Sequence, residues 1–207
     1  KLININFFKS CYEDFTNFNA YKTTTDTNVC SPESSLIITE QSSWGISRST
    51  INNSGLPSFC LSLYDEAPKE DDIFNTTLTP ASDISFNNSN YNNSQIIDKV
   101  QRTLSVKNYP SISSSDTSLT SDFYKAIAVV IWHYTDDLDI SNYNYSWVGG
   151  DGNTYTVAQL KQAIDANYIP ALDVIWLIPQ NSDRQPEALL NTNTSSDCCP
   201  TPPSLTT

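Results

Sequence analysis

One long apolar segment stands out in a chain whose other stretches are mostly polar. Residues 121–137 have the sequence SDFYKAIAVVIWHYTDD, and the run from Ala126 to Trp132 is apolar on nearly every side of a helix. Ser121 is a suitable N-cap, and Asp122 places a negative charge in the first turn, where the helix dipole favours it. The pattern predicts a helix buried inside the domain, against which other elements pack.

Alternation of apolar and polar residues predicts strands on both sides of this helix. Residues 1–8 and 59–64 alternate, residues 36–39 form a short apolar run, and residues 171–178 place Leu, Val, Trp and Ile on one face. The glycines of residues 147–155 are typical of a hairpin or tight loop.

Two further segments have helical spacing. In residues 94–107, Ile97, Val100 and Leu104 fall on one face, and a Tyr-Pro pair follows. Thr156 and Gln159 form a capping box at the start of a second helix.

The order of strands, then helices, then strands predicts an α+β fold. We expect a single domain over residues 1–195, with a β-rich sandwich or barrel lobe from about 1–93 and 141–195. The helical lobe is expected as an insertion over about 94–140, and residues 196–207 as the start of a Thr/Pro-rich stalk.

The charge of the chain excludes two classes of partner. Its net charge is −12, from 11 Lys and Arg against 23 Asp and Glu. Nucleic acids and anionic membranes both require a basic surface, so neither is expected as a partner.

No apolar run approaches the roughly 20 residues that cross a bilayer. The abundance of Asn, Ser and Thr favours an extracellular protein.

The five cysteines cannot all pair with one another, because their number is odd. Cys198 and Cys199 are adjacent, and a bridge between neighbours is strained, so each is expected to pair with Cys11 or Cys30. Cys60 is then left alone. The cysteine spacing and the single histidine favour no metal site, and no cofactor is expected.

Four segments, in order, resemble the thioester domains at the tips of Gram-positive surface adhesins. The segments are PSFCLSLYDE (57–66), DKVQRTLSVKNYP (98–110), AIAVVIWHYTD (126–136) and ALDVIWLIPQNSDRQPEALL (171–190). The last is similar to the family's final strand and its apolar-Gln-x-apolar-apolar motif. The family's helix motif of TQxA type is matched only at Ile131 and Trp132, because Ile127 and Ala128 stand where the Thr-Gln pair would be.

The resemblance implies an internal thioester between the Cys60 sulfur and the side-chain carbonyl of Gln185, formed with loss of ammonia; Gln180 is the alternative partner. A lysine amine on an extracellular protein would attack the acyl carbon and expel the Cys60 thiolate. His133 is a possible helper of that amine. Since the reaction occurs once per molecule, the resemblance implies a cell-surface adhesin, attached through the downstream stalk, and not a turnover enzyme.

Two other functions stay open. Cys60 and His133, with an aspartate or Asn142 to orient the ring, have the residue types of a cysteine hydrolase or acyltransferase. Alternatively, the absent helix Gln is consistent with an extracellular module that has lost the thioester and binds its partner reversibly.

Overall fold

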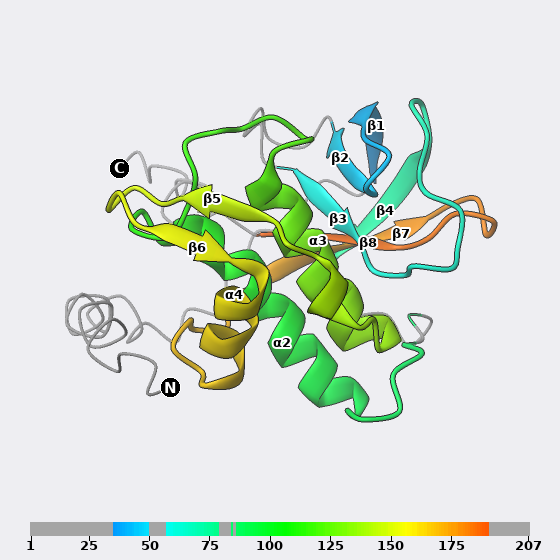
Figure 1. Ribbon diagram of the computed structural model, residues 1–207. Helices are drawn as coiled ribbons and strands as arrows, with labels where there is room; N and C mark the ends of the chain where they lie inside the picture. The colour runs from blue at the N-terminus through cyan, green and yellow to red at the C-terminus, as the bar shows by residue number, and fades with distance from the viewer. Residues whose placement is uncertain (1–34, 50–56, 79–83, 85, 191–207) are drawn as a thin grey trace, which may run out of the picture.

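The computed structural model describes residues 35–49, 57–78, 84 and 86–190. Within these residues, strands form a closed antiparallel barrel in the order β1-β2-β3-β8-β7-β4 (Figure 1). Their bounds are β1 Ser35–Gln41, β2 Ile46–Ser49, β3 Ser58–Cys60, β4 Ile73–Thr77, β7 Val174–Pro179 and β8 Glu187–Leu190.

The helices lie together against one side of this barrel (Figure 1). They are α2 Asn93–Ser105, α3 Asp122–Asp136 and α4 Val157–Asp165, with the short 3-10 helices η3 Val106–Asn108 and η4 Ile140–Asn142. A two-stranded hairpin, β5 Ser146–Val148 and β6 Thr154–Thr156, borders α3 and α4. None of the described helices is long and apolar enough to cross a membrane.

The central helix forms as the sequence predicts. The Ser121 hydroxyl accepts the Tyr124 N–H at the start of α3, and every residue from Ala126 to Trp132 is buried. Such a helix must be covered on all sides, and α2, α4 and the β5–β6 hairpin supply part of that cover. Thr156 also caps α4 as predicted, by accepting the Gln159 N–H.

The predicted α+β fold is confirmed, and one detail differs. The strand predicted over residues 59–64 ends at Cys60 as β3, because the chain then leaves the barrel and the Leu63 N–H is bound by the Asp136 carboxylate on α3. The bounds of the helical lobe, residues 94–140, stay a prediction; α4, which follows them, packs its apolar face on α2 and α3. The strand predicted over residues 1–8, the pairing of Cys11, Cys30, Cys198 and Cys199, and the stalk lie outside the described residues.

Strand alternation divides the apolar residues into two cores. On β7, Ile175 and Leu177 belong to the barrel core, whereas Val174 and Trp176 belong to the core shared with the helices. Leu177 pairs directly with Glu187 of β8, so this glutamate lies on the barrel side of its strand. An ionisable residue therefore occupies a position that the pattern of the barrel assigns to an apolar one.

Candidate functional site

Cys60 is the last residue of β3 and lies in a tight contact with Gly45. Its side chain is 1% exposed, and it is the free cysteine of the described residues. The Cys60 N–H donates to the Gly45 carbonyl at 2.8 Å. Gly45 has φ +60, and a Cβ there would lie 2.7 Å from the Cys60 Sγ and 3.4 Å from Cζ2 of Trp132. Only glycine fits both this backbone conformation and this approach.

Glu187 of the neighbouring strand β8 lies directly beside Cys60. The two are direct partners in the β3–β8 register, and Glu187 Oε1 lies 3.5 Å from the Cys60 Sγ. The Ser47 hydroxyl donates to the same oxygen at 2.8 Å, and the Ser58 hydroxyl donates to Oε2 at 2.7 Å. Glu187 is completely buried. The structure thus holds a thiol against a carboxyl group whose two oxygens are both fixed.

The pairing of the strands explains why these four side chains meet. Ser58 and Cys60 are two residues apart on β3 and share one face, and Ser58 pairs with Ser47 on β2. Glu187 enters opposite Cys60, so its carboxyl group reaches both serines. The four come from three neighbouring strands of the barrel, which makes the arrangement rigid.

Burial governs the protonation of this pair. It raises the pKa of Glu187 from 4.5 to about 7, although the hydrogen bonds from the two serines and the thiol act in the opposite direction. Burial also raises the pKa of the Cys60 thiol well above its usual value, and the adjacent Glu187 charge raises it further. Cys60 is therefore a protonated thiol at neutral pH and not a thiolate.

Gln185, the predicted thioester partner, is buried but has other hydrogen-bond partners. Its side-chain oxygen accepts the Ser62 N–H at 3.2 Å, and its amide nitrogen donates to the Asp65 carbonyl at 3.3 Å. Its backbone N–H donates to the Glu66 carbonyl. The carboxamide thereby holds the loop that follows Cys60. The bond between Cys60 and Gln185 stays a prediction.

The two remaining predicted residues also have partners of their own. Gln180 is exposed at the end of β7, and its amide donates to Asn75 at 3.1 Å. The His133 Nδ1 lies 2.8 Å from the Leu138 carbonyl oxygen, and its ring packs edge-on against Tyr134. Among the described side chains, the structure brings Glu187 to Cys60.

Comparison with known proteins assigns the family. Residues 57–173, more than half of the chain, match the family described as TED, the thioester domain. The chain belongs to the thioester domain family. The resemblance predicted from the four sequence segments is thereby confirmed.

A solved thioester domain shares its fold, and a solved adhesin is reported beside it. The N-terminal thioester domain of the fibronectin-binding protein SfbI from Streptococcus pyogenes matches with a TM-score of 0.50 and 12% identity, over 80% of this chain and 94% of that one. A Cys426Ala mutant of the pilus-presented adhesin Spy0125 (Cpa) matches with a TM-score of 0.48 and 12% identity, over 73% of this chain and 42% of that one. No curated protein matches the chain.

Sequence reasoning missed Glu187, although a signal for it was present. In this thioester domain Pro186-Glu187-Ala188-Leu189-Leu190 has the spacing of the apolar-Gln-x-apolar-apolar motif, with glutamate in place of glutamine. The nearby Gln185 drew the assignment because it has the expected side chain. The β3–β8 register instead places Glu187 opposite Cys60, and the Gln185 side chain binds Ser62 and Asp65.

Aromatic side chains border the Cys60 site on the side of α3. Trp132 stacks on Trp44, with ring centroids 6.4 Å apart, and Trp44 meets Tyr145 edge-on at 5.3 Å. The Trp132 indole N–H is buried, and none of the described residues accepts a hydrogen bond from it. Of these rings, Trp132 is the one that reaches Gly45 beside the thiol.

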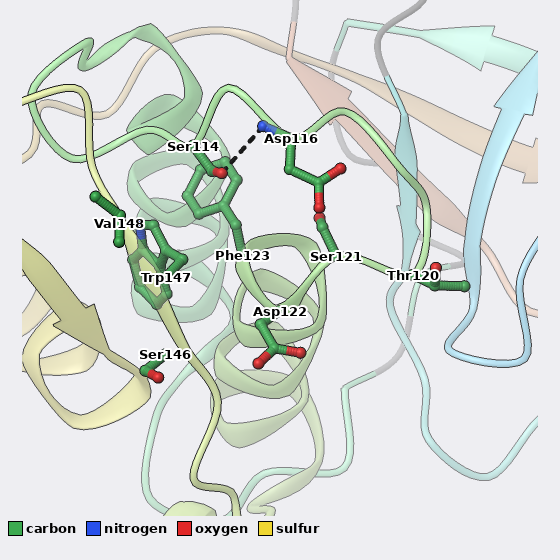
Figure 2. Close-up of a pocket in the computed structure, with 9 residues that line it drawn as sticks. All are labelled: Ser114, Asp116, Thr120, Ser121, Asp122, Phe123, Ser146, Trp147 and Val148. Atoms are coloured by element: carbon green, nitrogen blue, oxygen red, sulfur yellow. Dashed lines mark hydrogen bonds between the residues drawn. The ribbon is translucent and has the colours of Figure 1, made fainter. Parts of the chain in front are cut away.

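A separate pocket of about 370 Å³ lies at the N-terminal end of α3 (Figure 2). Figure 2 shows it between the Ser114–Ser121 loop, the first turn of α3 and strand β5, with Asp116 and Asp122 among its lining residues. Asp122 is paired with Lys125. Neither Cys60 nor Glu187 lines this pocket, so the thiol has no share in it. The described residues contain no group of three or more His, Cys, Asp or Glu that could hold a metal ion.

The hydrolase alternative makes a prediction about thiol reactivity. A catalytic cysteine needs an accessible thiolate with a base in contact, whereas Cys60 is buried with a raised pKa and the His133 Nδ1 faces Leu138. We expect the Cys60 peptide of the folded domain to stay largely unlabelled by iodoacetamide at pH 7.5 and to label fully in urea. His133→Ala should leave the labelling rate unchanged. Rapid labelling that depends on His133 would restore the hydrolase hypothesis.

Proposed function

We propose that this thioester domain is an extracellular adhesion module that attaches its parent surface protein to another protein, and that the encoded chain does so reversibly. The observation that carries the proposal is the pairing of Cys60 with Glu187 at 3.5 Å. Closure of a thioester with loss of ammonia requires a carboxamide, and Glu187 has none. The thiol and the carboxyl group therefore stay separate.

An adhesion role is supported by the family and by the composition. The SfbI match is described as a domain of a fibronectin-binding protein, and the Spy0125 match as a pilus-presented adhesin. The net charge of −12 and the low content of charged residues, 16%, agree with a role outside the cell. Nothing in this role requires turnover, so we propose a binding protein and not an enzyme.

A second candidate function is covalent attachment through a thioester between Cys60 and Gln185. It is favoured by the burial of the Gln185 carboxamide, 4% exposed, and by its hydrogen bonds to the loop that follows Cys60. A lysine amine of the partner would attack the acyl carbon, the C–S bond would break, and the Cys60 sulfur would take up a proton. Each molecule would react once. For the bond to form, Gln185 would first have to release Ser62 and Asp65.

The intact mass of the freshly purified, glycan-stripped domain separates the two candidates. We expect the mass calculated from the sequence, apart from hydrogens lost to disulfides, for the wild type and for Cys60→Ala alike. A deficit of one ammonia in the wild type, absent from Cys60→Ala and reversed by methylamine, would establish the thioester and overturn the reversible mode.

The adhesion role itself is tested with the domain coupled to beads and exposed to solubilised extracellular-matrix and cell-surface proteins. Retained proteins should elute in SDS without a covalent adduct, and Cys60→Ala should retain them equally. Retention no greater than on beads carrying the heat-unfolded domain would contradict an adhesion role.

A further inference from the structure

We infer that Glu187 occupies the acyl position of the Cys60 site, and that this site is built for thioester closure and lacks only the leaving group. The inference rests on the proposed function and deepens it, because it names the atom that stops the encoded chain from reacting. It predicts that a single substitution, Glu187→Gln, converts a reversible adhesion domain into a covalent one.

The first argument is the closeness of the Glu187 carboxyl group to the Cys60 sulfur. Glu187 is the direct register partner of Cys60, and its Oε1 lies 3.5 Å from the Sγ. The acyl carbon is bonded to this oxygen, so the sulfur is held beside the carbon that it would attack, which replaces a bimolecular encounter by an effectively intramolecular one. The strand pair supplies this proximity before any chemistry begins.

The second argument is the pair of hydrogen bonds that the Glu187 carboxyl group accepts. Ser47 and Ser58 donate to its two oxygens at 2.8 and 2.7 Å, and no described cation pairs with it. A buried carboxyl group without a cation is costly, and an apolar residue would stabilise the barrel better. In a glutamine at position 187 one of these two oxygens is the carbonyl oxygen, and the serine that donates to it would stabilise the charge that develops there during addition at the acyl carbon. These buried hydrogen bonds are therefore explained by the chemistry of closure and not by the stability of the barrel.

The third argument is the chemistry of closure. In the Glu187→Gln chain the Cys60 sulfur adds to the side-chain carbonyl carbon, the C–S bond forms and the C–N bond breaks. The thiol proton leaves with the amide nitrogen as ammonia, so no oxidant or other reactant is needed. The encoded Glu187 would have to expel water from the protonated acid instead. Burial beside Gly45 and Trp132 then protects the bond from hydrolysis.

Gln185 is not equivalent to a glutamine at position 187. In the antiparallel register that pairs Cys60 with Glu187, residue 185 comes opposite Ser62, and its side-chain oxygen does bind the Ser62 N–H. Two residues correspond to about 6.8 Å along a strand. Gln185 would have to break two hydrogen bonds and cross that distance to reach the thiol.

The test is the intact mass of the Glu187→Gln domain, compared with the mass calculated from its own sequence. We expect a deficit of one ammonia, and methylamine treatment should then open the thioester and add one methylamine to the domain. The Cys60→Ala/Glu187→Gln double variant should show no deficit. Adding Gln185→Glu or Gln180→Glu to Glu187→Gln should leave the deficit in place. After methylamine treatment, peptide mapping should find the methylamide at position 187.

Four outcomes separate this inference from the proposed function on which it rests. A folded Glu187→Gln domain that keeps its full mass overturns it, with the fold judged by circular dichroism and by an unfolding transition like that of the wild type. A deficit that disappears with Gln185→Glu assigns the acyl position to Gln185 and also overturns it. A deficit already present in the wild type overturns the reversible mode of the proposed function, whereas loss of bead retention alone contradicts only the adhesion role.

Discussion

Gly45→Ala is expected to lower the free energy of unfolding by roughly 2–5 kcal/mol, the sum of two separate costs. An alanine at φ +60 carries a backbone penalty of about 1–2 kcal/mol, because its Cβ crowds the following carbonyl. The new Cβ would also lie 2.7 Å from the Cys60 Sγ and 2.8 Å from the Cys60 Cβ. Over-packing of this kind costs about 1–3 kcal/mol. Urea denaturation followed by tryptophan fluorescence measures the sum.

Gly152→Ala is the matched control for this experiment. Gly152 also has a positive φ, +82, but a Cβ there meets no atom within 4 Å. It should therefore show the backbone cost alone, and Gly45→Ala should be the more destabilising by the cost of crowding at Cys60. Equal effects of the two substitutions would mean that Gly45 does not form the wall of the Cys60 site.

The second large effect is a dependence of stability on pH that comes from Glu187. The folded domain keeps the Glu187 proton up to a pKa of about 7, whereas the unfolded chain releases it near 4.5. Below pH 4.5 both states are protonated and the favourable contribution is complete. It is lost as the pH rises through about 7. The rise in pKa from 4.5 to about 7 corresponds to roughly 3 kcal/mol.

This effect is best measured as a difference between two variants that cannot form a thioester. Relative to Cys60→Ala, the Cys60→Ala/Glu187→Gln domain should gain up to roughly 3 kcal/mol in free energy of unfolding between pH 4.5 and pH 8. Asp139 and Asp165, whose hydrogen bonds hold their pKa values low, act in the opposite direction but equally in both chains.

An exposed glutamate provides the control for the pH experiment. Glu70→Gln, in the same Cys60→Ala background, removes a carboxyl group that is open to solvent and should change the pH profile very little. A flat difference between the Glu187 variant and its parent would mean that folding does not raise the pKa of Glu187.

Some parts of the site follow from local sequence. The odd number of cysteines singled out Cys60, and the structure describes it as free and buried. The helix over residues 121–137 was predictable because an uninterrupted apolar run with a capping serine has few alternatives. The helix signal lies within one short stretch, and the cysteine signal is a residue count. Neither depends on which segments come into contact in the fold.

The acyl position did not follow from local sequence. Gln185 and Glu187 are two residues apart, so the alternation of a strand places both on the same face and cannot choose between them. The predicted strand of residues 59–64 was equally uninformative about where its pairing ends. The choice depends on the register of β3 against β8, which pairs Cys60 with Glu187.

The sequence by itself determined the family, the α+β class, the buried helix and the lone thiol. Each of these rests on a periodic pattern, on the order of motifs or on the odd number of cysteines. Only the tertiary structure decided that a carboxyl group faces this thiol, that Ser47 and Ser58 bind it, and that Gly45 closes the site. These contacts join strands far apart in the chain. Their register is fixed by the packing of the closed barrel as a whole, and not by the propensity of any one segment.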